Sequence, residues 1–231
     1  MAAPARGAAI ALLRARGALR RVAARHALST LPTARYEALV ADGALRRDDH
    51  QLAALRTLDR VWKELETYEP PNAAPLLGLD SKAPVGAYVH GGVGCGKTYV
   101  MDLFFDVAPT QNKQRVHFHA MMLDVHGKLD ALRRRDGPPH PNPMRAVALD
   151  VLQNGSLLCF DEFQVTDIAD ALVVKSLFEH LFDSGAVVVA TSNRAPRDLY
   201  ENGVQRQVFE PLIPVWKSNL QPDFNVRVFE F

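Results

Sequence analysis

The sequence predicts an α/β fold in which a parallel sheet is flanked by helices. Between residues 84 and 217, apolar runs of strand length alternate with longer segments of helical periodicity. The runs at 156–160 and 186–190 are almost entirely apolar, as in strands that are covered on both faces. A glycine-rich loop at 91–98 joins the first run to the first helical segment. Parallel sheets bind ligands beyond the carboxyl ends of their strands, where this loop would lie.

Each element follows from a local pattern. Leucines at three- and four-residue steps predict helix over 36–69, with a break at Gly43 and a second helix capped by Asp48 or Asp49. Prolines then mark a linker that ends at residue 83. The remaining predicted elements are a strand at 85–90, a helix at 97–107, a strand at 115–122, helices at 123–135 and 145–153, a strand at 156–160, a helix at 168–182, a strand at 186–190, helical segments at 197–202 and 209–217, and a last strand at 225–231.

Composition and charge are those of an ordinary globular protein. The 231 residues suffice for one α/β domain with an extension. A net charge of +1 gives no electrostatic argument for nucleic acid or an anionic membrane, and we predict no nucleic-acid partner. The two cysteines do not form a disulfide framework, which favours a reducing compartment. No apolar run approaches the roughly 18 to 20 residues that span a bilayer.

The N-terminus differs from the rest of the chain in charge. Residues 1–36 contain seven arginines and no acid, and most of the others are alanine or leucine. This pattern is typical of a mitochondrial transit peptide, which we predict over residues 1–35, with localisation in the matrix or at the matrix face of the inner membrane. A secretory signal is disfavoured because Arg14 and Arg16 interrupt the apolar stretch. A disordered basic tail or a nucleic-acid arm is the alternative.

The loop at 91–98 carries the strongest functional pattern. It reads Gly-Gly-Val-Gly-Cys-Gly-Lys-Thr and fits the phosphate-binding P-loop. Glycines let several N–H groups point at one anion, and the next helix adds its positive N-terminal end. Lys97 has the reach for the β- and γ-phosphates, and Thr98 offers a hydroxyl to Mg²⁺. A plain glycine-rich turn is the alternative. The predicted nucleotide-binding residues are Gly91, Gly92, Val93, Gly94, Cys95, Gly96, Lys97 and Thr98.

A second pattern follows the strand at 156–160, which ends in Asp161 and Glu162. After a P-loop on an earlier strand, this arrangement predicts that Asp161 holds Mg²⁺ opposite Thr98. Glu162 is placed to polarise the attacking water as a general base. Two acids that begin a helix are the structural alternative. The predicted metal residues are therefore Thr98 and Asp161.

A third pattern follows the strand at 186–190, which ends in the small polar residues Thr191, Ser192 and Asn193. These residues would lie at the same edge of the sheet as the P-loop. We predict that Asn193 hydrogen-bonds the γ-phosphate or the attacking water. Asparagine also suits a turn, but the order of the three patterns favours the functional interpretation.

Longer runs carry a resemblance to a known family. The run after residue 157 reads Leu-Cys-Phe-Asp-Glu-Phe-Gln-Val-Thr-Asp-Ile-Ala-Asp, which is far more specific than an apolar strand with two acids. Here and at Tyr88–Thr98, Val116–His126 and Thr191–Gly203 the chain resembles the AFG-one-like ATPases. This AAA+ family is also named after lactation-elevated protein and the bacterial division ATPase ZapE. The resemblance covers residues 36–217 and implies a P-loop NTPase core of AAA+ type at 84–217, preceded by a helical extension and linker at 36–83.

The resemblance also implies partners and a reaction. A family member would bind ATP and Mg²⁺, hydrolyse ATP and form a homo-oligomer. Its partners would be protein clients, or mitochondrial membrane proteins and proteases, in protein quality control and the turnover of respiratory-chain subunits. Arg206 corresponds to an arginine finger that stabilises transition-state charge in a neighbouring subunit's site. Arg194 and Arg197 are rivals, and a solvated arginine is the structural alternative for each.

Two segments depart from the family: residues 136–148, rich in Pro, Gly and Arg, and the divergent tail at 218–231. AAA+ proteins close the nucleotide site with a C-terminal helical lid, and we expect this lid to be missing. Two functions therefore stay open. The first is an Mg²⁺-dependent ATP hydrolase. The alternative is a truncated, non-catalytic nucleotide-binding subunit that modulates full-length partners.

Two weaker patterns have structural alternatives. His117 and His119 would share a face of the predicted strand at 115–122, and with His126 they raise the alternative of a metal site. No spacing typical of zinc completes it. Cys95 lies in the P-loop at a helix N-terminus, where thiols are prone to oxidation. A small residue that simply fits is the simpler interpretation.

Overall fold

A parallel five-stranded sheet forms the centre of the computed structural model, which describes residues 30–70, 83–135, 138–165, 168–199 and 226–230. The strand order is β2-β3-β4-β1-β5, and every pairing is parallel. This order confirms the predicted α/β fold. The strands are β1 (Gly86–His90), β2 (Lys113–His117), β3 (Leu157–Asp161), β4 (Val187–Ser192) and β5 (Val226–Glu230).

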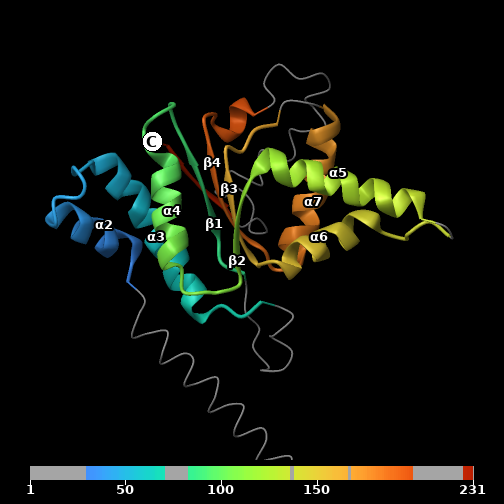
Figure 1. Cartoon of the computed structure of the whole chain (residues 1–231), viewed down its shortest axis with the longest axis horizontal. Coiled ribbons are helices and arrows are strands. Elements are labelled where there is room, and N and C mark those ends of the chain that lie inside the picture. Colours follow the sequence, from blue (N-terminus) through green and yellow to red (C-terminus); the bar gives the residue numbers. More distant parts are fainter. Residues whose placement is uncertain (1–29, 71–82, 136–137, 166–167, 200–225, 231) are drawn as a thin grey trace, which may run out of the picture.

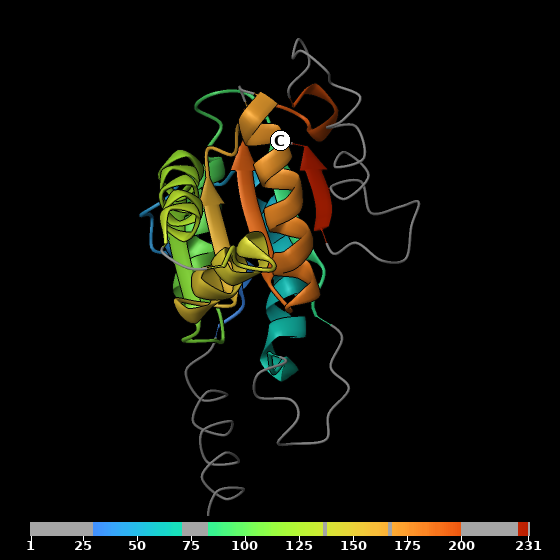
Figure 2. The same cartoon turned by 90° about the vertical axis from the view of Figure 1, so that its right-hand side faces the viewer.

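Helices cover both faces of the sheet (Figure 1). On one face lie α2 (Pro32–Ala41), α3 (Asp49–Thr67) and α4 (Lys97–Val107), and on the other lie α5 (Phe118–Arg134), α6 (Pro143–Gln153) and α7 (Ile168–Asp183). Figure 2 shows α7 in front of the strands. The predicted layered architecture is therefore confirmed. No helix in the described ranges has the length and apolar character to cross a membrane.

Alternate strand residues supply two separate cores, because successive side chains in a strand point to opposite faces. On β3, Leu158 and Phe160 pack with the α5–α7 face. Leu157 and Cys159 pack with the α2–α4 face. All four side chains are fully buried. The continuous apolar run that predicted this strand is thus explained by burial on both sides.

The first N-terminal helix begins earlier than predicted, whereas the second begins where the sequence predicts it. Helix α2 starts at Pro32 rather than at residue 36, and so it overlaps the predicted transit peptide at 1–35. Thr33 ties it to α3, because its N–H and its hydroxyl both donate to the carboxylate of Asp59. Asp48, and not Asp49, caps α3 by accepting from the N–H groups of the two residues after Asp49.

The predicted strand at 115–122 is wrong in its second half. Strand β2 ends at His117, and α5 begins directly at Phe118. The alternation of polar and apolar residues also fits a helix here, because Phe118, Met122 and Val125 recur at helical steps and are buried. Helical packing of this face overrides the strand pattern. His119 therefore lies on a helix and does not share a strand face with His117.

The C-terminal part is described only in pieces. The predicted helical segment at 197–202 appears as a short 3-10 turn, Pro196–Asp198, and residues 200–225 lie outside the described part, including the predicted helix at 209–217. The predicted last strand is confirmed as β5, whose Val226 and Glu230 pair with Gly86 and His90 of β1. Most of the tail at 218–231, predicted to diverge from the family, also lies outside the described part.

Candidate functional site

The P-loop connects β1 to α4 at the carboxyl edge of the sheet. Gly94 and Gly96 have φ angles of 81° and 94°, in the left-handed region that glycine adopts without a steric penalty. A Cβ at Gly96 would also lie 2.5 Å from Nε2 of Gln51, at the end of a flexible side chain on α3 that would have to move aside. The left-handed backbone angles are therefore the main reason for glycine at these two positions.

Lys97 lies inside the curve of the loop. Its side chain is buried, and Nζ donates to the carbonyl oxygens of Gly91 and Gly92 at 3.1 and 2.6 Å. Nζ also lies 3.5 Å from Sγ of Cys95. The first turn of α4 contains no acidic residue, so the positive end of this helix is not neutralised locally. The amine and the helix terminus together place positive charge at the loop, which suits phosphate groups.

Asp161 stands at the centre of a hydrogen-bond network at the end of β3. Its Oδ1 accepts from the hydroxyls of Thr98 and Thr191, at 3.0 and 2.7 Å. Its Oδ2 accepts from Nη2 of Arg115 at 3.0 Å. The carboxylate is buried. Hydroxyl and carboxylate oxygens are the hard ligands that Mg²⁺ prefers, so the pair formed by Thr98 and Asp161 fits this metal.

The backbone turns sharply at Glu162. Its φ of 54° is the one positive value at a non-glycine residue in the described part of the chain. Its N–H donates to the hydroxyl of Thr191 at 3.3 Å, and the next N–H, of Phe163, donates to the carbonyl of Thr191 at 2.7 Å. These bonds to β4 fix the turn. The side chain of Glu162 is exposed beside the buried Asp161, as a group that must reach a water molecule requires.

The end of β4 is hydrogen-bonded both to the P-loop and to the turn that follows β3. The carbonyl of Ser192 accepts from the N–H of Gly91 at 3.3 Å, and its hydroxyl donates to the carbonyl of Phe163 at 2.7 Å. Tyr88 on β1 donates to the carbonyl of Arg194 at 2.9 Å, and burial raises the pKa of its phenol far above the ordinary value. Asn193 is exposed between these anchored residues, at the same edge as the P-loop.

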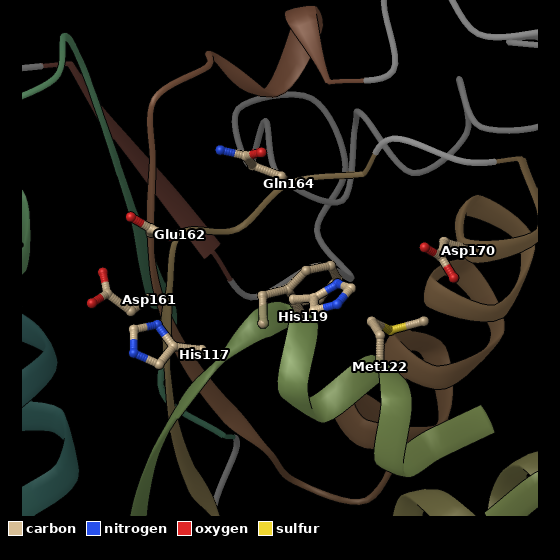
Figure 3. A pocket seen from close by; sticks show the side chains of 8 residues that line it. His117, His119, Met122, Asp161, Glu162, Gln164 and Asp170 are labelled. Carbon is tan, nitrogen blue, oxygen red and sulfur yellow. The ribbon is translucent and has the colours of Figure 1, made fainter. Parts of the chain in front are cut away.

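A pocket of about 220 Å³ lies beside Asp161 and Glu162. Figure 3 shows His117 next to Asp161 at one end and Asp170 of α7 at the other. The pocket is also lined by Phe118, His119, Met122 and Gln164. It places an open space next to the exposed carboxylate of Glu162.

The metal alternative for the histidines receives no support. His126 bonds to Asp170, with Nε2 and Oδ1 2.7 Å apart, and does not join His117 and His119. Among the described residues no group of three or more His, Cys, Asp or Glu side chains is placed to hold a metal ion. The histidines are accounted for by the pocket and by this link between α5 and α7.

Of the three candidate finger arginines, the structure describes the side chain of one. Arg206 lies outside the described residues, as does the side chain of Arg197. Arg194 is exposed. Sequence reasoning missed Arg115, whose only signal was a cation inside a strand, and it missed the anchoring role of Tyr88.

Comparison with known proteins gives a family match. The model of the AFG1-like ATPase family matches residues 30–226. The match extends past both ends of the range 36–217 that carried the resemblance. It includes residues 136–148 and the first part of the tail at 218–231, which we had expected to depart.

Two curated relatives are similar over most of this chain. Lactation elevated protein 1 homolog B of Danio rerio is 38% identical over 79% of the chain and 46% of its own length. Cell division protein ZapE of Escherichia coli (strain K12) is 40% identical over 83% of the chain and 53% of its own length. The chain therefore spans about half the length of the curated relatives it matches.

A solved structure supports the fold. The structure of DnaI superposes with a TM-score of 0.51 at 17% identity, covering 81% of this chain and 88% of that one. At this identity the likeness concerns the fold alone. The P-loop position, the strand order and this likeness together identify a P-loop NTPase fold of AAA+ type.

Proposed function

The chain is a member of the AFG1-like ATPase family, and from this premise we propose that it binds ATP with Mg²⁺ and hydrolyses it. The observation that carries the proposal is the 3.0 Å bond between Thr98 and Asp161, beside the buried amine of Lys97. It joins the two motifs that a P-loop NTPase needs at one point.

Each residue of the site has a role in the proposed reaction. Loop N–H groups and Lys97 bind and orient the phosphates. Thr98 and Asp161 would hold Mg²⁺, which neutralises charge on the phosphates when bound. Glu162 accepts a proton from the attacking water. Asn193 hydrogen-bonds that water or the γ-phosphate.

We also propose that a second copy of the chain completes the site. Hydrolysis leaves charge on the transferred phosphoryl group, and an arginine from a neighbouring subunit stabilises it in many such enzymes. Arg206 is the proposed finger, with Arg194 and Arg197 as rivals. Each of the three arginines is replaced by alanine in turn. Only the variant that lacks the true finger should show lower ATP turnover with unchanged ATP affinity.

Steady-state ATP hydrolysis tests the proposal. Lys97→Ala should abolish nucleotide binding, and Glu162→Gln should keep ATP bound without turnover. Lys63→Ala, an exposed lysine on α3, is the matched control and should hydrolyse ATP like the wild type. One shared background rate for wild type and both site variants would reject hydrolysis. ATP binding by the wild type in that case would favour the alternative, a non-catalytic nucleotide-binding subunit that modulates full-length partners.

We propose mitochondrial localisation from the arginine-rich, acid-free segment before α2. Because α2 begins at Pro32, a targeting segment that leaves the helix intact ends at residue 31. Residues 1–31 fused to a fluorescent protein should therefore enter mitochondria. The same fusion with its arginines changed to alanine is the control. A cytosolic signal from the unaltered fusion would contradict the proposal.

The family resemblance further supports a role in protein quality control and the turnover of respiratory-chain subunits. The chain would act on protein clients, with mitochondrial membrane proteins and proteases as partners. Glu162→Gln should retain such clients, because ATP stays bound, whereas Lys97→Ala should release them. Equal recovery of inner-membrane proteins with both variants would argue against a nucleotide-driven role.

A further inference from the structure

Arg115 joins two carboxylates that come from different elements of the candidate site. Its Nη2 donates to Oδ2 of Asp161 on β3 at 3.0 Å, and its Nε lies 2.5 Å from Oδ1 of Asp102 on α4. The Asp161 side chain is 5% exposed, and the Arg115 side chain is 28% exposed. The guanidinium therefore contacts the predicted metal ligand in a largely sheltered position.

The sheet explains why this cation lies there. Arg115 pairs in register with Cys159, whose side chain packs on the α4 face of the sheet. Lys113, two residues earlier on β2, reaches the same face and donates to the carbonyl of Phe105 near the end of α4. Strand β2 thus presents two cations to the P-loop helix, one at its C-terminal end and one next to Asp161.

The contacts of Asp161 are divided between its two oxygens. Oδ1 faces the hydroxyls of Thr98 and Thr191, and Oδ2 faces Arg115. The guanidinium is shared between this carboxylate and that of Asp102, so it offsets part of the negative charge at Asp161. Magnesium is usually held by one or two carboxylates together with substrate phosphates. A carboxylate whose charge is partly offset by arginine attracts a free divalent cation less strongly, so the nucleotide phosphates must supply the remaining attraction for the metal.

We propose that Arg115 is a specificity-determining residue that makes Mg²⁺ binding conditional on bound nucleotide. The positive charge of Arg115 keeps free metal away from Asp161, and the phosphates of the nucleotide overcome this exclusion. The inference rests on the proposed function, since it assigns a role at the same Mg²⁺-nucleotide site. Its consequence is that the site does not fill with free metal before nucleotide arrives.

The size of the effect follows from electrostatics. A monovalent and a divalent cation about 6 Å apart repel each other enough to change affinity about tenfold, even at the dielectric constant of water. The sheltered position of Asp161 makes the medium less screening than water. Removal of the charge at Arg115 should therefore tighten binding of free metal at least about tenfold.

The test is metal binding to the nucleotide-free full chain, with Mn²⁺ as a spectroscopic probe in place of Mg²⁺. Arg115→Met and Arg115→Gln remove the charge, and the glutamine keeps an N–H donor for Asp161. Both should bind Mn²⁺ at least about tenfold more tightly than the wild type. Arg115→Lys keeps the charge and should bind like the wild type. Arg133→Met, at an exposed arginine on α5, is the matched control and should show no change.

A second change shows whether the effect passes through Asp161. In Arg115→Gln combined with Asp161→Asn, the gain in Mn²⁺ affinity should disappear. If Arg115→Met does not fold, Arg115→Gln gives the same measurement. Wild-type Mn²⁺ affinity in both neutral variants, or equally tight binding by Arg115→Lys, would overturn the proposal. Binding of Mg²⁺-ATP by the wild type is measured separately, and its failure would reject the proposed function whatever the arginine variants do.

Discussion

The hydroxyl of Thr98, in the first turn of the P-loop helix, donates a 3.0 Å hydrogen bond to Asp161 at the end of β3. This bond joins two motifs that are far apart in the sequence. Replacing Thr98 by valine keeps the shape of the side chain and removes the hydroxyl. ATP affinity in Mg²⁺ should fall about tenfold or more, while affinity in EDTA should change little. Thr98→Ser is the control, and an equal loss in both buffers would argue against a metal role.

The positive φ of Glu162 predicts a conflict between stability and activity. A non-glycine residue in this conformation costs roughly 1–2 kcal/mol. Glu162→Gly should therefore leave the free energy of unfolding unchanged or raise it by about 1 kcal/mol, while it abolishes ATP turnover. Glu162→Val should lower stability, because a branched side chain fits this conformation poorly. Denaturant titration of the two variants makes the comparison, and a stable valine variant would contradict the strained backbone.

Gly86 permits the close approach of β1 and β4. A Cβ at this position would lie 1.9 Å from the carbonyl oxygen of Val188. Gly86→Ala should therefore destabilise the fold by about 3 kcal/mol or more, or prevent folding. Gly127 in α5 has open space around it, and Gly127→Ala should stabilise by roughly 0.5–1 kcal/mol. Thermal unfolding of both variants checks the pair. A well-folded Gly86→Ala variant would contradict the sheet register.

The two cysteines should differ in reactivity. Burial raises the pKa of the Cys159 thiol to about 12, so it stays protonated and inaccessible in the folded protein. Cys95 is partly exposed in the P-loop. A thiol reagent at pH 8 should label one site in the native chain, and ATP should protect it. Two labelled thiols in the native state would contradict the buried position of Cys159.

The same burial predicts a loss of stability at high pH. Unfolded cysteine loses its proton above about pH 8.5, whereas folded Cys159 keeps it up to about pH 12. Burial also raises the pKa of the Tyr68 phenol to about 12. Both groups favour the folded state at neutral pH. Their contribution to stability is lost as the pH rises from about 9 towards 12.

Much of the fold follows from local sequence. The bounds of helix α4 were predicted without error, because the P-loop marks its start. The bounds of strand β3 were predicted to within one residue, because burial on both faces gives a continuous apolar run. The boundary between β2 and α5 was wrong, because Phe118 and Met122 satisfy both a two-residue and a helical period. Only packing against the sheet decides between them. The start of α2 was missed because the bond from Thr33 to Asp59 links residues that are distant in sequence.

The site shows the same limit. Lys97, Thr98 and Asp161 lie in recognisable motifs, and the structure brings them to one edge of the sheet. Arg115 carries no motif, and its importance depends on strand pairing that places β2 beside β3. Patterns in a single sequence identify functional residues within one loop or at the end of one strand. They do not report which distant cation will face them.

If the P-loop binds the phosphates of ATP, the Lys97→Ala change should remove nucleotide binding, which is measured as equilibrium binding of a fluorescent ATP analogue to the wild type and to Lys97→Ala. Lys97 is buried inside the loop and donates to its carbonyls, so its amine is positioned where phosphate oxygens must bind. Saturable binding by the wild type that Lys97→Ala abolishes is the predicted result. Undiminished affinity in a folded Lys97→Ala variant, or no binding by the wild type, would contradict it.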